Sequence, residues 1–151
     1  MIKSDKYIRI IDQLKELFTR TDDLDARMAT VSALLHHKLS QTLWTGFYIL
    51  KNGELLVKMY QGPLACQVLK RNTGVCWTAI IEKQTIIVPD VQQFKGHIAC
   101  DPRSKSEIVV PVYNSLKEII GVLDIDSKVL NGFDATDGEY LEKIVQLLID
   151  L

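Results

Sequence analysis

Three cysteines and a set of acidic residues are the parts of this sequence best able to do chemistry. The cysteines are Cys66, Cys76 and Cys100, and the last of them lies in the polar segment GHIACDPRSKSE. That segment holds a histidine, an arginine and a lysine, and it ends at Glu107, where an apolar run begins. Because nearby cations favour the thiolate form of a cysteine, a thiol in this setting is a candidate nucleophile.

Two more acids, Asp124 and Asp126, lie in the segment LDID. Side chains two apart on a strand point to the same face of a sheet, so these carboxylates would lie side by side and repel each other unless a cation joins them. A solvent-facing sheet surface is the competing interpretation. Trp44 and Tyr48, four apart in WTGFY, share a face in the same way, although aromatic residues at this spacing are more often core.

The spacing of the cysteines gives no metal motif. They are separated by 10 and 24 positions (66 to 76 and 76 to 100), and no CxxC half-site is present, so no metal site is predicted. Free cysteines are often simply small buried hydrophobes. Combined, however, thiols, carboxylates and an aromatic wall would suit a pocket for a small amine that carries an oxidised sulfur, with a thiolate attacking that sulfur and a second cysteine closing a disulfide.

Composition bounds the class of protein. The chain has 151 residues, of which 47% are hydrophobic and 25% charged, and its formal net charge is −1. These values favour one globular domain over residues 1–151, without the charge pattern of a partner for nucleic acid or an anionic membrane. No apolar run reaches the roughly 20 residues that span a bilayer, and no secretory signal is present. We therefore expect a cytoplasmic protein, in which a disulfide is usually transient, catalytic or sensory.

The elements that must position these residues follow from periodicity and turn signals. Helical spacing predicts helices over 7–18, 24–35, 72–84 and 134–151, and β-branched or aromatic runs predict strands over 43–50, 54–60, 85–90, 107–113 and 119–126, with a short extended run within 61–70. The order predicts an α+β domain with one mostly antiparallel central sheet and N- and C-terminal helices packed against it.

Helix caps can also be predicted from the residue types. Thr21 is expected to cap the second helix, and Asn72 or Thr73 the third. Thr136 and Glu139 are expected to form a capping box at the last helix.

The segments QGPLAC, GVCWTA, VPDV, FKGHIACD, SKSEIVVPV and IIGVLDIDS, in this order, closely resemble the free methionine-(R)-sulfoxide reductases, which are built on a GAF domain. The resemblance runs from residue 44 to the closing helix. Its most specific parts are the three cysteines at their mutual spacing and the acids that follow them. It implies a GAF-like fold, no bound cofactor, and a dimer to which the helix YIRIIDQLKELF could contribute.

The resemblance also implies roles for the sulfurs. Cys100 matches the catalytic cysteine, whose thiolate attacks the sulfoxide sulfur and is left as a sulfenic acid. Cys66 matches the resolving cysteine, which forms a disulfide with Cys100, and thioredoxin recharged by NADPH reduces that disulfide. Cys76 matches a third, secondary cysteine.

The same resemblance assigns the acids and the aromatic residues. Glu107, Asp124 and Asp126 match the acids around the substrate's ammonium group and sulfoxide oxygen, and either Asp126 or Glu107 is expected to give that oxygen its proton. Trp44 and Tyr48 match the residues that hold the S-methyl group. An anchored free ammonium group would disfavour methionine within a peptide.

One departure and two rival functions stay open. Trp77 stands where the family usually has glycine, and its indole could tighten the pocket, displace the Cys76 segment or pack outside. One rival is a GAF module that binds a small molecule without turnover. The other is a redox sensor in which Cys76, at a helix start, is the reactive thiol.

Overall fold

The fold is a single antiparallel sheet with helices on both faces. The computed structural model describes residues 1–97 and 100–150. Its helices are α1 (Lys3–Leu17), α2 (Leu24–Lys38), α3 (Gly74–Glu82), the short 3-10 helix η1 (Val91–Gln93) and α4 (Ala135–Gln146). Its strands are β1 (Thr42–Lys51), β2 (Glu54–Gln61), β3 (Val68–Leu69), β4 (Ile86–Val88), β5 (Ser106–Tyr113) and β6 (Ile119–Ser127).

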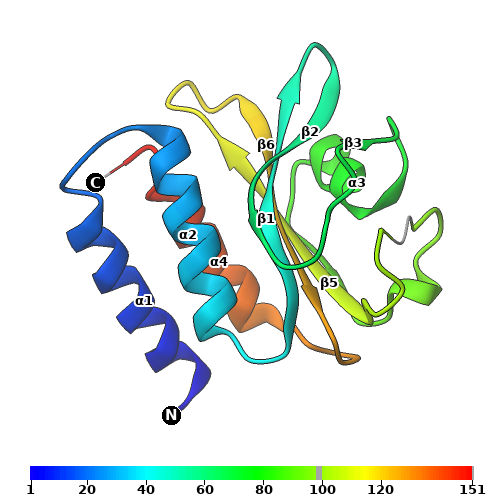
Figure 1. Cartoon of the computed structure of the whole chain (residues 1–151), viewed down its shortest axis with the longest axis horizontal. Helices are drawn as coiled ribbons and strands as arrows, with labels where there is room; N and C mark the ends of the chain where they lie inside the picture. The colour runs from blue at the N-terminus through cyan, green and yellow to red at the C-terminus, as the bar shows by residue number, and fades with distance from the viewer. Residues whose placement is uncertain (98–99, 151) are drawn as a thin grey trace.

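The sheet has six strands in the order β3-β2-β1-β6-β5-β4, and every paired neighbour runs antiparallel. The predicted α+β class is therefore confirmed. Helices α2 and α4 cover one face of the sheet, α1 packs outside them, and α3 with its flanking loops covers the opposite face (Figure 1). None of the helices in the described residues has the length and apolar character that crossing a bilayer requires.

Alternation along the central strands gives the two faces different chemistry. On the helix face, Ile108 and Val110 of β5 and Leu123 and Ile125 of β6 join the larger hydrophobic cluster with α1, α2 and α4. Residues between them point the other way, and Val109 joins the second cluster under α3. Since side chains alternate strictly along a strand, the acids of β5 and β6 must share this second face.

The caps of two helices differ from those predicted. At α2 the N-cap is Asp23, whose carboxylate accepts a hydrogen bond of 2.8 Å from the backbone N–H of Ala26. The hydroxyl of Thr21 instead accepts from the N–H of Asp23 and so stabilises the turn before the helix. The prediction of Thr21 as cap was wrong by two residues because two acceptors compete within three positions, and only one lies within reach of the first free N–H groups.

The capping box of α4 is also shifted. Asp134 is the N-cap and forms a reciprocal capping box with Asp137, whereas Thr136 and Glu139 take no part in it. Glu139 lies one turn further on and pairs with Lys143 at 3.3 Å. The predicted box failed because the N-cap, Asp134, lies two residues before the position assumed for it, Thr136.

A buried arginine, Arg27, links the helices on this face of the sheet. The guanidinium of Arg27 donates to the carbonyl groups of Thr21 and Phe18 and to those of Leu147 and Leu148. These carbonyls lie near the C-terminal ends of α1 and α4, where the helix dipoles are negative. The charge of Arg27 is therefore met by backbone oxygens at two helix ends, which ties α1, α2 and α4 together.

The contact between α1 and α4 gives a testable stability term. The hydroxyl of Tyr7 donates to a carboxylate oxygen of Asp137 at 2.6 Å, and the ring is fully buried. We expect Tyr7→Phe to lower the free energy of unfolding by about 1.5–3 kcal/mol, because a buried hydrogen bond to a charged acceptor is lost. Thermal unfolding followed by circular dichroism measures this, with Tyr140→Phe as the matched control, since that hydroxyl makes no hydrogen bond within the described residues. Equal stability of the two variants would contradict the prediction.

Candidate active site

The sheet register places the predicted acids and aromatic residues in adjacent rows. Glu107 of β5 lies opposite Asp126 of β6, and Asp126 lies opposite Trp44 of β1. In the next row Asp124 lies opposite Gly46. Residues directly opposite each other on antiparallel strands share a face and lie about 4.5–5.5 Å apart at Cβ. Three neighbouring strands thus bring together groups from residues 44, 107, 124 and 126.

Gly46 makes room for the aromatic wall. A Cβ atom there would lie 2.7 Å from the Trp44 ring and would also collide with Tyr60. Without that atom the indole lies across the strand and stacks between two tyrosine rings, with centroid distances of 5.5 Å to Tyr48 and 5.2 Å to Tyr60. The glycine of WTGFY is therefore the residue that lets Trp44 and Tyr48 form one continuous surface.

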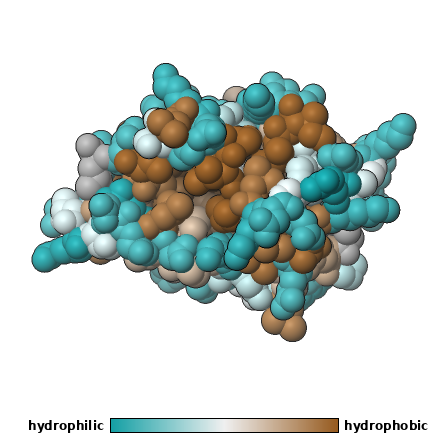
Figure 2. Space-filling view, turned by 90° about the horizontal axis from the view of Figure 1, so that it is seen from above, coloured by the Kyte–Doolittle hydropathy of each residue, from teal (hydrophilic) through white to brown (hydrophobic). Residues whose placement is uncertain are grey.

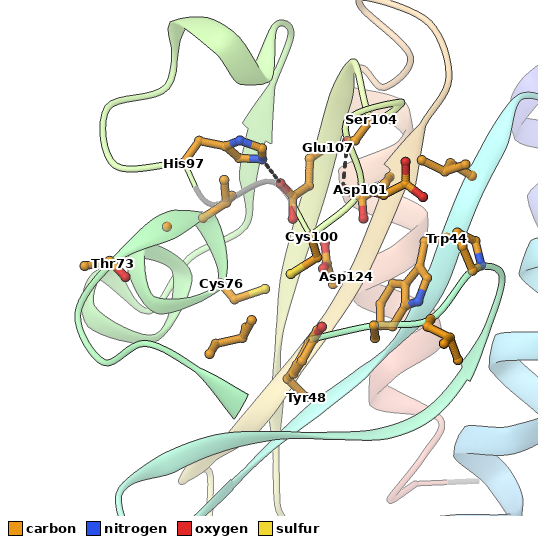
Figure 3. Close-up of a pocket in the computed structure, with 18 residues that line it drawn as sticks. Trp44, Tyr48, Thr73, Cys76, His97, Cys100, Asp101, Ser104, Glu107 and Asp124 are labelled. Carbon is orange, nitrogen blue, oxygen red and sulfur yellow. Dashed lines mark hydrogen bonds and ion pairs between the residues drawn. The ribbon is translucent and has the colours of Figure 1, made fainter. Parts of the chain in front are cut away.

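A pocket opens over these rows, between the sheet and α3 (Figure 3). Each predicted site residue except Cys66 lines it. Residues that were not predicted as site residues complete the lining, namely Leu43, Pro63, Leu64, Ala65, Leu69, Thr73, Gly74, Val75, His97, Asp101 and Ser104. The pocket therefore has carboxyl groups and aromatic rings on its sheet side, with sulfur atoms contributed by α3 and by the loop before β5.

Cys66 and Cys100 are joined by a disulfide at the mouth of this pocket. Their Cα atoms are 5.8 Å apart, and the bond links segments 34 residues apart in the sequence. Gly62 guides the first segment: its φ is +117°, and a Cβ there would lie 2.6 Å from the carbonyl oxygen of Leu43. The hydroxyl of Tyr48 then donates to the carbonyl of Cys66 at 3.2 Å. This is the disulfide pairing that the sequence resemblance implies.

Cys76 is the free cysteine, and it is buried. It sits in the first turn of α3, whose N-cap Thr73 makes no side-chain capping bond because its hydroxyl donates to the carbonyl of Lys70. Burial, and then the charges of Asp124 and Glu107, raise the pKa of the Cys76 thiol well above its ordinary value. These influences oppose the helix dipole on which the redox-sensor interpretation relied, so the ligand-free protein holds Cys76 as a thiol.

The three acids lie near enough to one another to raise one another's pKa values. Burial, followed by the charge of Asp126, raises the pKa of Glu107 to about 8. Burial and neighbouring carboxylates raise the pKa values of Asp124 and Asp126 well above the usual range. The contact between Asp124 and Glu107 lowers the pKa of Glu107 and raises that of Asp124, so within this pair it favours the proton on Asp124. Ser104 donates to Asp126 at 3.2 Å.

No lysine or arginine among the described residues forms an ion pair with these acids. His97 lies 3.5 Å from Glu107, but burial lowers the pKa of His97, so both partners are neutral near pH 7. The guanidinium of Arg103 forms an ion pair with the carboxylate of Asp101 at 2.7 Å, and that contact lowers the pKa of Asp101 to about 2. No lysine or arginine of the described residues therefore competes with a ligand's cation for these acids.

Two buried polar atoms of the pocket lack hydrogen-bond partners within the described residues, Nε1 of Trp44 and Oδ1 of Asp124. Leaving a buried donor or acceptor unpaired costs about 1–3 kcal/mol. One atom is a donor and the other an acceptor, so a zwitterionic ligand, with both an ammonium group and negatively charged oxygen, fits the pair.

Trp77 packs outside the pocket. Its ring is buried against the second hydrophobic cluster, and its Nε1 donates to the carbonyl of Leu69 at 3.3 Å. Of the three arrangements that the sequence left open, the structure has this one. The indole joins α3 to β3 and so supports the segment between Cys66 and Cys76.

The raised pKa of Glu107 has a consequence for stability. Between pH 4.5, the ordinary value for a glutamate, and pH 8, the folded protein keeps a proton that the unfolded chain has released. The contribution of this carboxyl to the free energy of unfolding is therefore fully present below pH 4.5 and is lost as the pH rises towards 8. One pKa unit corresponds to about 1.4 kcal/mol, and 1 kcal/mol moves the Tm of a domain of this size by roughly 2–4 °C.

We therefore expect the Tm of Glu107→Gln, relative to the Tm of the unmodified protein, to rise by several degrees between pH 5 and pH 8. Circular dichroism without ligand measures both Tm values. The exposed Glu54→Gln is the control and should run parallel to the unmodified protein. Parallel curves for Glu107→Gln would show that Glu107 ionises in its ordinary range.

Comparisons with known proteins agree with this geometry. The GAF domain family model matches residues 21–148. The chain is 41% identical over 128 residues to the free methionine-R-sulfoxide reductase of Saccharomyces cerevisiae, covering 80% of this chain and 71% of the relative. It is 38% identical over 148 residues to the free methionine-R-sulfoxide reductase of Escherichia coli, covering 98% of this chain and 89% of the relative.

A solved structure has the same overall fold. The free methionine-R-sulfoxide reductase from Neisseria meningitidis, in complex with its substrate, superposes with a TM-score of 0.92 at 36% identity, covering 98% of this chain and 89% of that one. The chain therefore belongs to the GAF domain family and, within it, to the free methionine-R-sulfoxide reductases.

Proposed function

We propose that this protein reduces free L-methionine (R)-sulfoxide to L-methionine with its own cysteine thiols. The observation that carries the proposal is a group of three acids, Glu107 and Asp124 buried and Asp126 half-buried, that no lysine or arginine of the described residues pairs with. They lie beside a pair of cysteines that can form a disulfide. A free amino acid with an oxidised sulfur supplies both the missing cation and an electrophile for the thiol.

The acids bind and orient the substrate. The ammonium group enters the space beside Glu107, Asp124 and Asp126, and its charge draws their pKa values back down so that carboxylate and ammonium pair. A carboxyl that keeps its proton, Asp126 or Glu107, protonates the sulfoxide oxygen as the sulfur is attacked. The Ser104 hydroxyl positions Asp126 for this step through their hydrogen bond.

The aromatic wall selects the sulfur end of the substrate. The stacked rings of Trp44 and Tyr48 offer a flat apolar surface for the S-methyl group. The unpaired Nε1–H of Trp44 is a donor for the carboxylate or the sulfoxide oxygen of the same molecule. A methionine sulfoxide within a peptide has lost its free ammonium group and would leave the acids unpaired, so it is a poor substrate.

The sulfur chemistry balances in two steps. The Cys100 thiolate attacks the sulfoxide sulfur, one proton is taken up, and the oxygen passes to the cysteine sulfur as the S–O bond of the sulfoxide breaks. Methionine leaves reduced by two electrons, and Cys100 is left oxidised as a sulfenic acid. The Cys66 thiol then displaces that oxygen as water and forms the disulfide, as in the structure. Thioredoxin, recharged by NADPH, returns both sulfurs to thiols, with no bound cofactor and with Cys76 in a secondary role. A cytoplasmic location follows from this reductant.

A homodimer is part of the same proposal, because the family resemblance implies one. Large apolar side chains of α1 and its start are exposed and offer a contact surface, namely Met1, Ile2, Ile8 and Leu17. Apolar side chains also gather on the face shown in Figure 2, within a rim of hydrophilic ones.

The function is tested by turnover with the two epimers of free methionine sulfoxide. With thioredoxin, its reductase and NADPH, we expect NADPH consumption and methionine release with the R epimer. We expect at least a hundredfold lower kcat/KM with the S epimer and with N-acetylmethionine (R)-sulfoxide, which lacks the ammonium group. Binding of the R epimer without turnover would replace the proposal with a ligand-binding GAF module.

The cysteine roles are tested one variant at a time. Cys100→Ser should abolish methionine release. Cys66→Ser should release one methionine per chain and then stall with thioredoxin, because the sulfenic acid lacks its partner, whereas Cys76→Ser should retain most turnover. Mass spectrometry of the oxidised chains measures the disulfide and the sulfenic acid. An active Cys100→Ser together with an inactive Cys76→Ser would overturn the assignment.

A further inference from the structure

We propose that Cys76, Glu107 and Asp124 form a binding site for one thiophilic divalent cation, such as Zn²⁺, on the floor of the pocket. The Cys76 sulfur and one carboxylate oxygen from each acid all lie within 4.8 Å of one another, and all three residues are buried. They come from α3, β5 and β6 and converge on one point (Figure 3).

The geometry suits a small tetrahedral ion. Zinc binds thiolate sulfur at about 2.3 Å and carboxylate oxygen at about 2.0–2.2 Å, so its ligand atoms lie about 3.3–3.8 Å apart. The three atoms, already within 4.8 Å of one another, would have to close by roughly 1–1.5 Å to reach these distances. Three protein ligands leave a fourth position open towards the pocket. His97, 3.5 Å from Glu107, is placed to hold that ligand in orientation from outside.

An independent observation points to a missing partner at this place. Oδ1 of Asp124 is buried and accepts no hydrogen bond within the described residues, and the Asp124 side chain faces the other two ligands. No lysine or arginine of the described residues pairs with either acid. A cation bonded to Oδ1 would satisfy that atom and, by displacing the protons that the two acids hold, would pair with both carboxylates at once.

The cysteine spacing did not predict this site because spacing detects ligands that lie in one local motif. Here the ligands are 31 and 17 positions apart (76 to 107 and 107 to 124), and only the packing of α3 on the sheet joins them. The metal site rests on this geometry alone. Its overlap with the place proposed for the substrate's ammonium group rests on the proposed function, and it makes the cation a competitor of the substrate.

The oxidised protein isolates the site. With Cys66 and Cys100 joined, Cys76 is the single free thiol of the chain. Oxidised full-length protein is titrated with Cd²⁺, which reports thiolate ligation through a charge-transfer band in the ultraviolet, and with Zn²⁺ against a chromophoric chelator. We expect one ion per chain, the thiolate band with Cd²⁺, and no displacement by millimolar Mg²⁺, which prefers oxygen ligands.

Variants separate this site from adventitious binding. Cys76→Ser should abolish the band, and both Cys76→Ser and Asp124→Asn should weaken Zn²⁺ binding at least tenfold, with circular dichroism verifying their folding. Asp12→Asn, the same change at an exposed position on α1, should bind as the unmodified protein does. Absence of one-to-one binding in the unmodified protein, or equal affinity in folded Asp124→Asn, would overturn the site.

Adding substrate to the same Cd²⁺ titration tests the proposed function separately. We expect free methionine (R)-sulfoxide to displace Cd²⁺ and to reduce the band. A band that persists at saturating substrate keeps the metal site and contradicts the placement of the ammonium group beside these acids. Turnover in metal-free buffer without any Cd²⁺ binding leaves the reductase function intact and removes the metal site alone.

Discussion

The crowding of three acids on one covered face of the sheet is the constraint on which the other properties of this molecule's site depend. A buried carboxylate is costly unless it is paired, and no lysine or arginine of the described residues pairs with Glu107, Asp124 or Asp126. Burial and crowding raise the pKa values of Glu107 and Asp124, so these carboxyl groups keep protons that exposed acids would release. The same crowding makes the pocket receptive to an external cation, and it keeps the neighbouring Cys76 thiol neutral. The charge of the site, its protonation and its preference for a cationic ligand thus all follow from the crowding of these acids.

Two kinds of backbone hold the two halves of the chemistry. The acids and the aromatic wall stand on β1, β5 and β6, neighbouring strands in the interior of the sheet, where ladder hydrogen bonds fix the rows. The disulfide sulfurs stand on segments outside the strands, one led over β1 by Gly62 and the other placed before β5. The Tyr48 hydroxyl connects the two halves, because it belongs to the wall and bonds to the Cys66 carbonyl.

Much of the site was readable from the sequence because its signals are local. The period of two placed Asp124 with Asp126 and Trp44 with Tyr48, and the motifs around the cysteines indicated the family. What depends on register was indicated by the family resemblance and not by periodicity, because Glu107 faces Asp126 only through one alignment of β5 with β6. The roles of Ser104 and His97 depend on the same alignment. Helix caps were misplaced where several acceptors crowd a helix start, as around Asp23 and Asp134.

The placement of acids on interior strands and sulfurs on loops also decides what fails first. Interior strands exchange their amide hydrogens through near-global opening, whereas loop segments open locally at small cost in free energy. Heat, denaturant or a protease will therefore disable the segments that carry Cys66 and Cys100 while the row from Trp44 to Glu107 is still intact. A partly unfolded molecule therefore still binds the amino acid after it has lost the ability to reduce it, and so it retains its ligand without turnover.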